Sequence, residues 1–417
     1  MNVKNILKSS SFKTISIFAG GNFIASVISG VSGLLYAQWI TPEELGEFNK
    51  YGILTGYLSI GLIFVHGALP RQYPYLIGKG DREEARKVAA AAKWWYLAFT
   101  WMGTVIFTIL MIKSIIESDK RAAIGWGAQI PALWMAIYGL YLQTLYRSSN
   151  DFRKLSYNQL ATSISAFILL FLVKLWGYFG FAVRNGTIGL VGLFTHERFV
   201  PDKVKATFDK KRLLELGKIS LPLSIPAYID TYLLNSSISF FILTYLGEKD
   251  LGVYGMALML QGIFMIFTRA IHQVYTTKIT IKFGETESVK DCLRYSKTPT
   301  LISMAASSAI AASLYLTLGP VITLLMPNYI ESVFILKIMI WQLPLFASGL
   351  GLIVMSSALW YREMVYLRIM KTATCLLLIL LLPKSLSNIA WSIIISDAIY
   401  YLSNYGVIKM KLKYMVG

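Results

Sequence analysis

The sequence predicts an all-α integral membrane protein with about twelve transmembrane helices, arranged in two parallel six-helix lobes. Of its 417 residues, 55% are hydrophobic and only 15% are charged, whereas soluble domains carry roughly a quarter charged residues. Long apolar stretches follow one another along the chain, each close to the roughly 20 residues that a helix needs to cross a bilayer. The lysines and arginines fall in short bursts between these stretches.

The charge balance and the cysteine content exclude several classes of function. The formal net charge is +18, from 40 basic and 22 acidic residues, which in a soluble protein would suggest a nucleic-acid partner. Because the cations are spread in short groups between apolar stretches, we expect no nucleic-acid partner. Two cysteines, Cys292 and Cys375, are too few for a disulfide scaffold or a cysteine-rich metal site.

The apolar stretches define twelve predicted spans in two series of six. The first series covers 14–40, 48–69, 94–116, 122–146, 157–173 and 179–195, and the second covers 219–246, 252–277, 299–318, 331–358, 364–383 and 386–407. The fifth and sixth spans are the weakest, because Lys174 and Arg184 interrupt this short, Gly-rich region. The first span is longer than the apolar region of a signal peptide and is therefore expected to remain as a membrane helix.

The connections between spans are short. Segment 70–93 is expected to form an amphipathic cytoplasmic helix, and the longest connection, 198–218, is basic and expected to be partly helical. No outer loop is large enough to hold a folded catalytic domain. Pro226 and Pro344 are expected to bend their spans, either as static kinks or as points of movement. At span ends, Arg71, Lys174 and Arg184 are expected to anchor the helices at the membrane surface.

The positions of the cations predict the orientation in the membrane. Thirty of the 40 lysines and arginines lie at the termini and in the loops on one side, and seven lie in the opposite loops. Cations accumulate on the cytoplasmic side of membrane proteins. Both termini are therefore predicted to face the cytoplasm, which agrees with an even number of spans.

An internal repeat divides the chain into two halves. When the sequence is shifted by 206 residues, the Leu-Gly pair at 45–46 lies over the Leu-Gly pair at 251–252, and His66 lies over His272. Parallel repeats of this kind are a recurrent transporter plan, with the substrate path between the halves. We therefore expect an N-terminal lobe over 1–205 and a C-terminal lobe over 206–417.

Short motifs in both halves carry a family resemblance. The first half has the sequence Tyr-Ala-Gln-Trp-Ile-Thr-Pro-Glu-Glu-Leu-Gly-Glu-Phe at 36–48. The second half has a Leu-Pro pair at 221–222, Asp230 in the seventh span, and Leu-Gly-Val-Tyr-Gly at 251–255. In this order the motifs resemble the polysaccharide transporter family, in particular the Wzx-type O-antigen flippases of the multidrug/oligosaccharidyl-lipid/polysaccharide exporter superfamily.

The resemblance implies a flippase, not an enzyme. Its cargo would be undecaprenyl-pyrophosphate-linked O-antigen or a similar oligosaccharide unit, moved across the bacterial cell inner membrane by alternating access. The implied partners are this cargo, membrane lipids, a coupling proton or sodium ion moved by antiport, and other O-antigen assembly proteins. The sequence has no phosphate-binding loop for ATP, and no cofactor is expected.

Three cations within spans are candidates for binding the cargo. Ionisable groups inside a membrane usually face a water-filled cavity or a partner, and an Arg fork matches phosphate oxygens. Arg269 in the eighth span fits this role or else snorkels to the headgroups. Lys337 in the tenth span is expected to face the cavity. Lys50 in the second span contacts cargo or pairs with Glu47.

Two acids and two histidines are candidates for ion coupling. Asp230 matches the family's Asp, and it carries a coupling ion or forms a salt bridge between helices, for instance with Arg269. Asp397 is the other carboxylate deep within a span. His66 and His272 lie near the ends of equivalent helices and are coupling groups or interfacial hydrogen-bonding groups.

Other functions remain as alternatives. A drug/cation antiporter of the same superfamily would be expected to carry acids in its N-terminal lobe, but the first span has none between Thr14 and Ile40. An O-antigen polymerase should have a sizeable outer loop with paired arginines, and an acyltransferase a deep histidine; neither feature is present. A structural scaffold would not need charges inside the membrane.

Overall fold

The computed structural model describes residues 10–149, 151–358 and 360–416, and within these ranges the ordered elements are all helical. Helices that continue one another form twelve segments along the chain, and these correspond in order to the twelve predicted spans. By length and apolar composition alone, five of the described segments could cross a membrane, or six if one bent pair is counted as a single span.

The bent pair forms the fifth and sixth segments. Helices α7 (Phe152–Ile168) and α8 (Leu170–Phe199) meet at an angle of 71°. Within α8, the φ of Gly177 is +51°, a backbone conformation open chiefly to glycine. A Cβ on Gly180 would lie only 1.9 Å from the backbone oxygen of Leu172. The chain therefore has a second sharp bend at Gly177, within α8.

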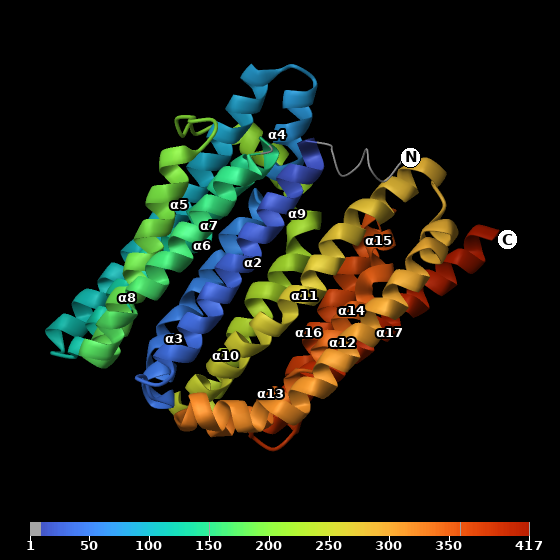
Figure 1. The fold of residues 1–417 in the computed structure, drawn as a ribbon. Coiled ribbons are helices and arrows are strands. Elements are labelled where there is room, and N and C mark those ends of the chain that lie inside the picture. The colour runs from blue at the N-terminus through green and yellow to red at the C-terminus, as the bar shows by residue number, and fades with distance from the viewer. Residues whose placement is uncertain (1–9, 150, 359, 417) are drawn as a thin grey trace. The chain divides into compact units, whose positions relative to one another are not determined.

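By its contacts the chain divides into two compact units. Unit 1 holds the described residues up to Ile40 together with Glu47–Tyr228. The helices of unit 1 are α2 (Ser10–Tyr36), most of α3 (Pro42–Leu58), η1 (Ser59–Phe64), α4 (Leu69–Gly78), α5 (Arg82–Ile116), α6 (Lys120–Ser148), α7, α8 and α9 (Lys210–Tyr228). In Figure 1 they run from blue to green.

Polar caps and buried aromatic residues shape unit 1. The side chains of Asp81, Asp119 and Asp151 accept hydrogen bonds from backbone amides in the first turns of α5, α6 and α7, and such caps favour helix starts at these positions. The core contains buried tyrosines, and one of them, Tyr146, donates its hydroxyl to the carbonyl of His196 at 2.8 Å.

The predicted amphipathic helix over 70–93 is divided in the structure. It consists of α4 and the first turns of α5, with a break at Lys79–Asp81 where the φ of Gly80 is +83°. The basic connection after α8 is irregular until α9 begins at Lys210. Helix α5 is thus a longer continuous rod than the span predicted at 94–116.

Unit 2 holds Thr41–Gly46 and Ile229 to the C-terminus. Its helices, yellow-green to red in Figure 1, are η2 (Ile229–Leu233), α10 (Leu234–Tyr245), α11 (Glu248–Thr286), α12 (Val289–Leu325), η3 (Pro327–Tyr329), α13 (Ile330–Met339), α14 (Gln342–Ser348), η4 (Gly349–Leu352), α15 (Ile353–Ser357), α16 (Tyr361–Leu381) and α17 (Leu386–Val416). The unit boundary at 228/229 differs from the lobe boundary predicted at 205/206, because α9 packs against η1 and α5 of unit 1.

The matched glycines of the internal repeat touch within unit 2. A Cβ on Gly46 would lie 1.7 Å from the backbone oxygen of Glu248, and a Cβ on Gly252 would lie 1.8 Å from that of Pro42. The first turns of α3 and α11 therefore approach backbone to backbone, which only glycine permits at both positions.

A π-helical turn stands at the start of unit 2. Helix α9 contains Pro222 and Pro226, and each proline removes a backbone donor from the helix. The turn η2 follows directly and is π-helical, a geometry found frequently at functional sites. Asp230 lies within this turn.

Candidate functional site

A polar cavity of about 350 Å³ lies within unit 2. It is lined by residues of η2, α10, α11, α13, α14, α16 and α17. A volume of this size is at the lower end of the range for small-molecule sites. Five charged side chains line it: Asp230, Arg269, Arg368, Lys371 and Asp397.

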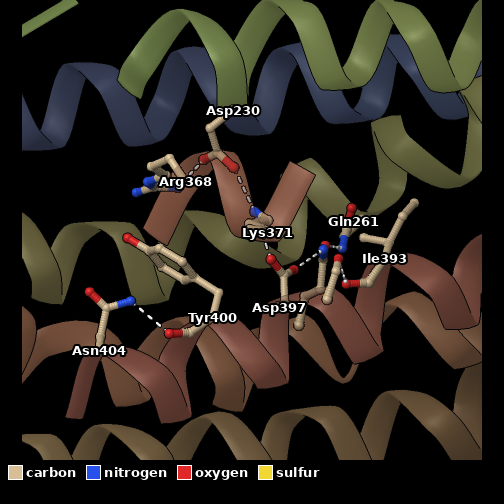
Figure 2. A network of polar contacts seen from close by, with 10 residues as sticks. Asp230, Gln261, Arg368, Lys371, Ile393, Asp397, Tyr400 and Asn404 are labelled. Atoms are coloured by element: carbon tan, nitrogen blue, oxygen red, sulfur yellow. Dashed lines mark hydrogen bonds and ion pairs between the residues drawn. The ribbon is translucent and has the colours of Figure 1, made fainter. Parts of the chain in front are cut away.

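Four of these charges form a chain of ion pairs (Figure 2). The Nζ atom of Lys371 lies 2.6 Å from Oδ1 of Asp230 and 2.7 Å from Oδ1 of Asp397. The guanidinium of Arg368 also pairs with Asp230. Lys371 thus bridges two carboxylates that come from η2 and α17, and Asp230 in turn bridges two cations on α16.

Two glutamines extend the network. The Nε2 atom of Gln342 donates to Asp397 at 2.5 Å. Gln261 on α11 donates to the side-chain oxygen of Gln342 and, at 3.0 Å, to the carbonyl of Met339. The network therefore connects η2, α16, α17, α14 and α11 through side chains inside the unit.

An aromatic side chain lies beside the cations. The guanidinium of Arg368 stands 4.5 Å from the ring centroid of Tyr400, and Nζ of Lys371 stands 5.7 Å from it. Cations at such distances are attracted to the negative face of the ring. Tyr400 faces the pair Arg368 and Asp230 in Figure 2.

Little solvent reaches the centre of the network. The side chains of Lys371 and Asp397 are 12% and 9% exposed, and that of Asp230 is 22% exposed. Ion pairs at such depth are costly to desolvate and gain their stability from good geometry and further hydrogen bonds. Removal of one partner leaves a buried charge without compensation.

The local sequence places these side chains on facing surfaces. Arg368 and Lys371 are three residues apart on α16 and therefore share one face of the helix. They lie roughly two and three turns after the helix begins at Tyr361. On the opposite side, the π-helical turn after Pro226 presents Asp230 to both cations.

The structure brings three of the predicted site residues to this cavity. Asp230, Asp397 and Arg269 all line it. Asp230 pairs with Arg368 and Lys371, not with Arg269 as one alternative supposed. His272 lies beside the cavity, because its ring packs 4.3 Å from the ring of Phe346, a lining residue.

The other three predicted residues lie elsewhere. Lys337 is half-buried, with Nζ 4.8 Å from the ring centroid of Tyr315 on α12. In unit 1, Lys50 stands 5.0 Å from the ring of Tyr51, and Nδ1 of His66 lies 2.9 Å from the hydroxyl of Tyr96. Glu47, an alternative partner for Lys50, pairs with Arg121 at 2.7 Å. The roles predicted for Lys50, Lys337 and His66 stay predictions.

Sequence reasoning missed Arg368 and Lys371. Both fall at the start of the span predicted at 364–383, where they were assigned to the cytoplasmic surface; this was wrong, because α16 begins at Tyr361 and carries them into the unit. Their spacing of three residues next to a long apolar run was the available signal, since it places two cations on one helix face.

The anchoring role expected for Arg184 was also wrong. Its side chain is buried, with 5% exposed, and it donates to the carbonyl of Ala166 at 2.9 Å and to the hydroxyl of Ser32 at 2.6 Å. Ala166 lies in the last turn of α7, where carbonyls have no partner within the helix. Arg184 satisfies one of them and joins α8 to α7 and α2.

Among the described residues, no group of three His, Cys, Asp or Glu side chains is arranged to hold a metal ion. The charged chemistry of the cavity is instead that of guanidinium, ammonium and carboxylate groups. Such a set can bind an anionic group through its cations and exchange a cation at its carboxylates.

Comparison with solved structures relates the fold to membrane transporters. An inward-facing multidrug resistance MATE family transporter of the MOP superfamily superposes with a TM-score of 0.70 at 15% identity, covering 93% of this chain and 95% of that one. The lipid II flippase MurJ, in an inward closed conformation, superposes with a TM-score of 0.70 at 14% identity. The match covers 94% of this chain and 87% of MurJ. An outward-facing MATE transporter superposes with a TM-score of 0.63 at 17% identity, and the match covers 98% of this chain and 97% of the transporter.

These likenesses concern the fold. No protein-family profile and no curated protein matches the chain by sequence. The predicted fold class, an all-helical membrane protein of about twelve spanning helices, is confirmed. The proteins it resembles are transporters and flippases, not enzymes.

Proposed function

We propose that this transporter-like protein is a flippase for undecaprenyl-pyrophosphate-linked O-antigen or similar oligosaccharide units in the bacterial inner membrane. The observation that carries the proposal is the cationic cavity of unit 2. It contains three cations, Arg269, Arg368 and Lys371, against two carboxylates. Arg368 and Lys371 are mostly buried and Arg269 is exposed, and a lining with this excess of positive charge favours an anionic cargo.

The geometry of the cations suits a pyrophosphate. Arg269 and Arg368 each offer a planar fork of donors that matches phosphate oxygens, and Lys371 adds a compact ammonium group. A pyrophosphate in the cavity would compete with Asp230 and Asp397 for these groups. The ion pairs of Arg368 and Lys371 with Asp230 and Asp397 would re-form when the cargo leaves.

The carboxylates are the candidates for ion coupling. A proton or sodium ion at Asp230 or Asp397 competes with Lys371 for the same oxygens, because Lys371 contacts both carboxylates. Occupation of the acids and release of the cations are therefore linked. We propose coupling to an ion gradient by alternating access on this basis, with both termini in the cytoplasm.

A drug/cation antiporter is the second candidate. The likeness to MATE transporters supports it as far as fold alone can. The carboxylates that a cationic drug would need are, however, already paired with cations in unit 2. In reconstituted vesicles, a flippase should move a fluorescent polyprenyl pyrophosphate-linked oligosaccharide and leave an organic cation such as ethidium unmoved. The reverse result would favour the antiporter.

Deletion and complementation test the proposed function in cells. Deletion of the gene should cause lipid-linked repeat units to accumulate on the cytoplasmic face of the membrane. Complementation with Arg269→Ala should restore less surface O-antigen than the wild-type gene, because one cargo contact is lost, although the protein reaches the membrane. Lys278→Ala is the matched control, an exposed cation of the same helix outside the cavity. Normal polymer display with Arg269→Ala would contradict the assignment.

A further inference from the structure

A second, larger cavity in unit 2 is apolar. It has a volume of about 750 Å³ and lies between α12, the α14–η4 segment and α17. We call it the α12 groove. Its walls include Leu301 and Leu402, whose side chains are 57% and 73% exposed in the chain alone. A groove lined by exposed leucines is suited to an apolar chain rather than to water.

Two cations stand at one end of the α12 groove. Arg294 and Lys297 both line it and are exposed. They are three residues apart on α12, so that both project from one helix face. Among the described residues, neither has an ion-pair partner, in contrast to the cations of the polar cavity. From Arg294 to Met304 the lining extends along about 15 Å of helix.

The α12 groove and the polar cavity share a wall. Tyr401 lines both of them. Its ring packs against Gly349, where a Cβ would lie 2.6 Å from Cε1 of the tyrosine. One aromatic side chain, held against a backbone without a Cβ, thus separates an apolar site from a charged one in the same unit.

We infer that the α12 groove is a loading site for the lipid end of the cargo, a polyprenyl pyrophosphate. Its apolar walls would hold a segment of the polyprenyl chain, and Arg294 and Lys297 would bind the pyrophosphate. Two cations one turn apart match two linked phosphates better than the single phosphate of a membrane phospholipid. The proximity of the polar cavity across Tyr401 places the sugar-bearing end beside the cationic network. This inference rests on the proposed function.

Binding to the purified full-length protein in nanodiscs tests the inference. The probe is photoreactive undecaprenyl pyrophosphate, with inorganic pyrophosphate and phosphatidylglycerol as competitors. The combined substitution Arg294→Gln and Lys297→Gln should weaken lipid binding at least about tenfold, since two charge-assisted contacts are lost. Leu301→Trp should fill the groove and weaken binding to a similar extent without changing its charge.

Two matched variants serve as controls on the same helix. Lys290→Gln removes an exposed cation and Leu316→Trp enlarges an exposed leucine, both outside the groove. Neither should change binding. Crosslinks in the wild-type protein should map to α12 and α17. Monodisperse elution shows which variants are folded, and either groove variant alone suffices for the comparison.

The outcomes separate a failure of this inference from a failure of the proposed function. Equal competition by phosphatidylglycerol would identify an ordinary lipid contact and overturn the inference, as would unchanged binding in the folded groove variants. Equal competition by inorganic pyrophosphate would show that the apolar walls contribute nothing and would also overturn it. If the groove binds the probe but wild-type vesicles do not flip the cargo, the loading site stands and the proposed function fails.

Discussion

Lys371 joins both carboxylates of the polar cavity through one ammonium group. Its Nζ is 2.6 Å from Asp230 and 2.7 Å from Asp397, at 12% exposure of the side chain. No other described residue contacts both acids in this way. The stability of the network and the ion exchange proposed at its carboxylates therefore depend on the same atom.

Replacement of Lys371 by Met should destabilise the protein strongly. The substitution leaves Asp397 without an ion-pair partner and Asp230 with only Arg368, and loss of one member of a buried pair costs about 3–5 kcal/mol. Thermal unfolding in detergent should show a clearly lowered Tm. Adding Asp397→Asn to the Met variant should recover part of the loss. An unchanged Tm for Lys371→Met alone would show that the network contributes nothing to stability.

Asp230→Asn should separate coupling from folding. The amide keeps the size of the side chain but cannot bind a proton or sodium ion as a carboxylate does, so gradient-driven flipping in vesicles should be abolished. Asp250→Asn, at the start of α11 and outside the cavity, is the control. Transport by Asp230→Asn at the wild-type rate would remove Asp230 from the coupling mechanism.

At the scale of elements, the glycine contact between α3 and α11 gives the internal repeat a physical meaning. The two helices carry equivalent Leu-Gly pairs, and their glycines meet backbone to backbone. The repeat therefore preserves a close approach of two helix starts in addition to a similar order of spans.

Gly252→Ala should destabilise this contact. The new Cβ would lie 1.8 Å from the backbone oxygen of Pro42, and backbone cannot move aside as a flexible side chain can. Overpacking of this kind costs about 1–3 kcal/mol, which thermal unfolding should detect as a lowered Tm. Gly284→Ala, also in α11 but with no atom near its Cβ position, should leave the Tm unchanged or slightly raised. Equal Tm values for the two variants would contradict the close approach.

The elements were more predictable than the site. Apolar runs determine helices in a membrane because every backbone group must be bonded within the chain, so the twelve segments follow from the sequence in order. The exact ends of the helices could not be predicted from the apolar runs, because α5 and α17 continue beyond them. Asp230 and Asp397 were recognisable as deep charges, whereas Arg368 and Lys371 looked like loop cations. Only the packing of α16 against η2 and α17 places them together.

At the scale of the whole molecule, the net charge of +18 has two components. Most cations fall at the termini and in the loops predicted to lie on the cytoplasmic side. Arg368 and Lys371 do not belong with the predicted cytoplasmic cations, and the buried Arg184 does not belong with those of the opposite loops. The excess of cations on the predicted cytoplasmic side remains without these three residues. The second component is the excess of cations over carboxylates in the polar cavity of unit 2, and this excess supports the choice of an anionic cargo.

Cysteine labelling can test the orientation of the whole chain. Lys205→Cys should be inaccessible to a membrane-impermeant maleimide in intact spheroplasts and become labelled after lysis, because its connection is predicted to be cytoplasmic. Glu117→Cys, in a loop predicted to lie on the outer side, should be labelled both in intact spheroplasts and after lysis. Both positions are exposed, and the native Cys292 and Cys375 are buried, so background should be low. The opposite pattern would invert the topology.

The π-helical turn of η2 links helix register to charge. An α-helix rotates by about 100° per residue, and a π-turn accommodates one residue more than an α-turn. If η2 were rewound as α-helix, Asp230 would rotate by about that angle relative to α10 and lose its alignment with Arg368 and Lys371. The widened turn therefore sets the helix register at which Asp230 meets Arg368 and Lys371.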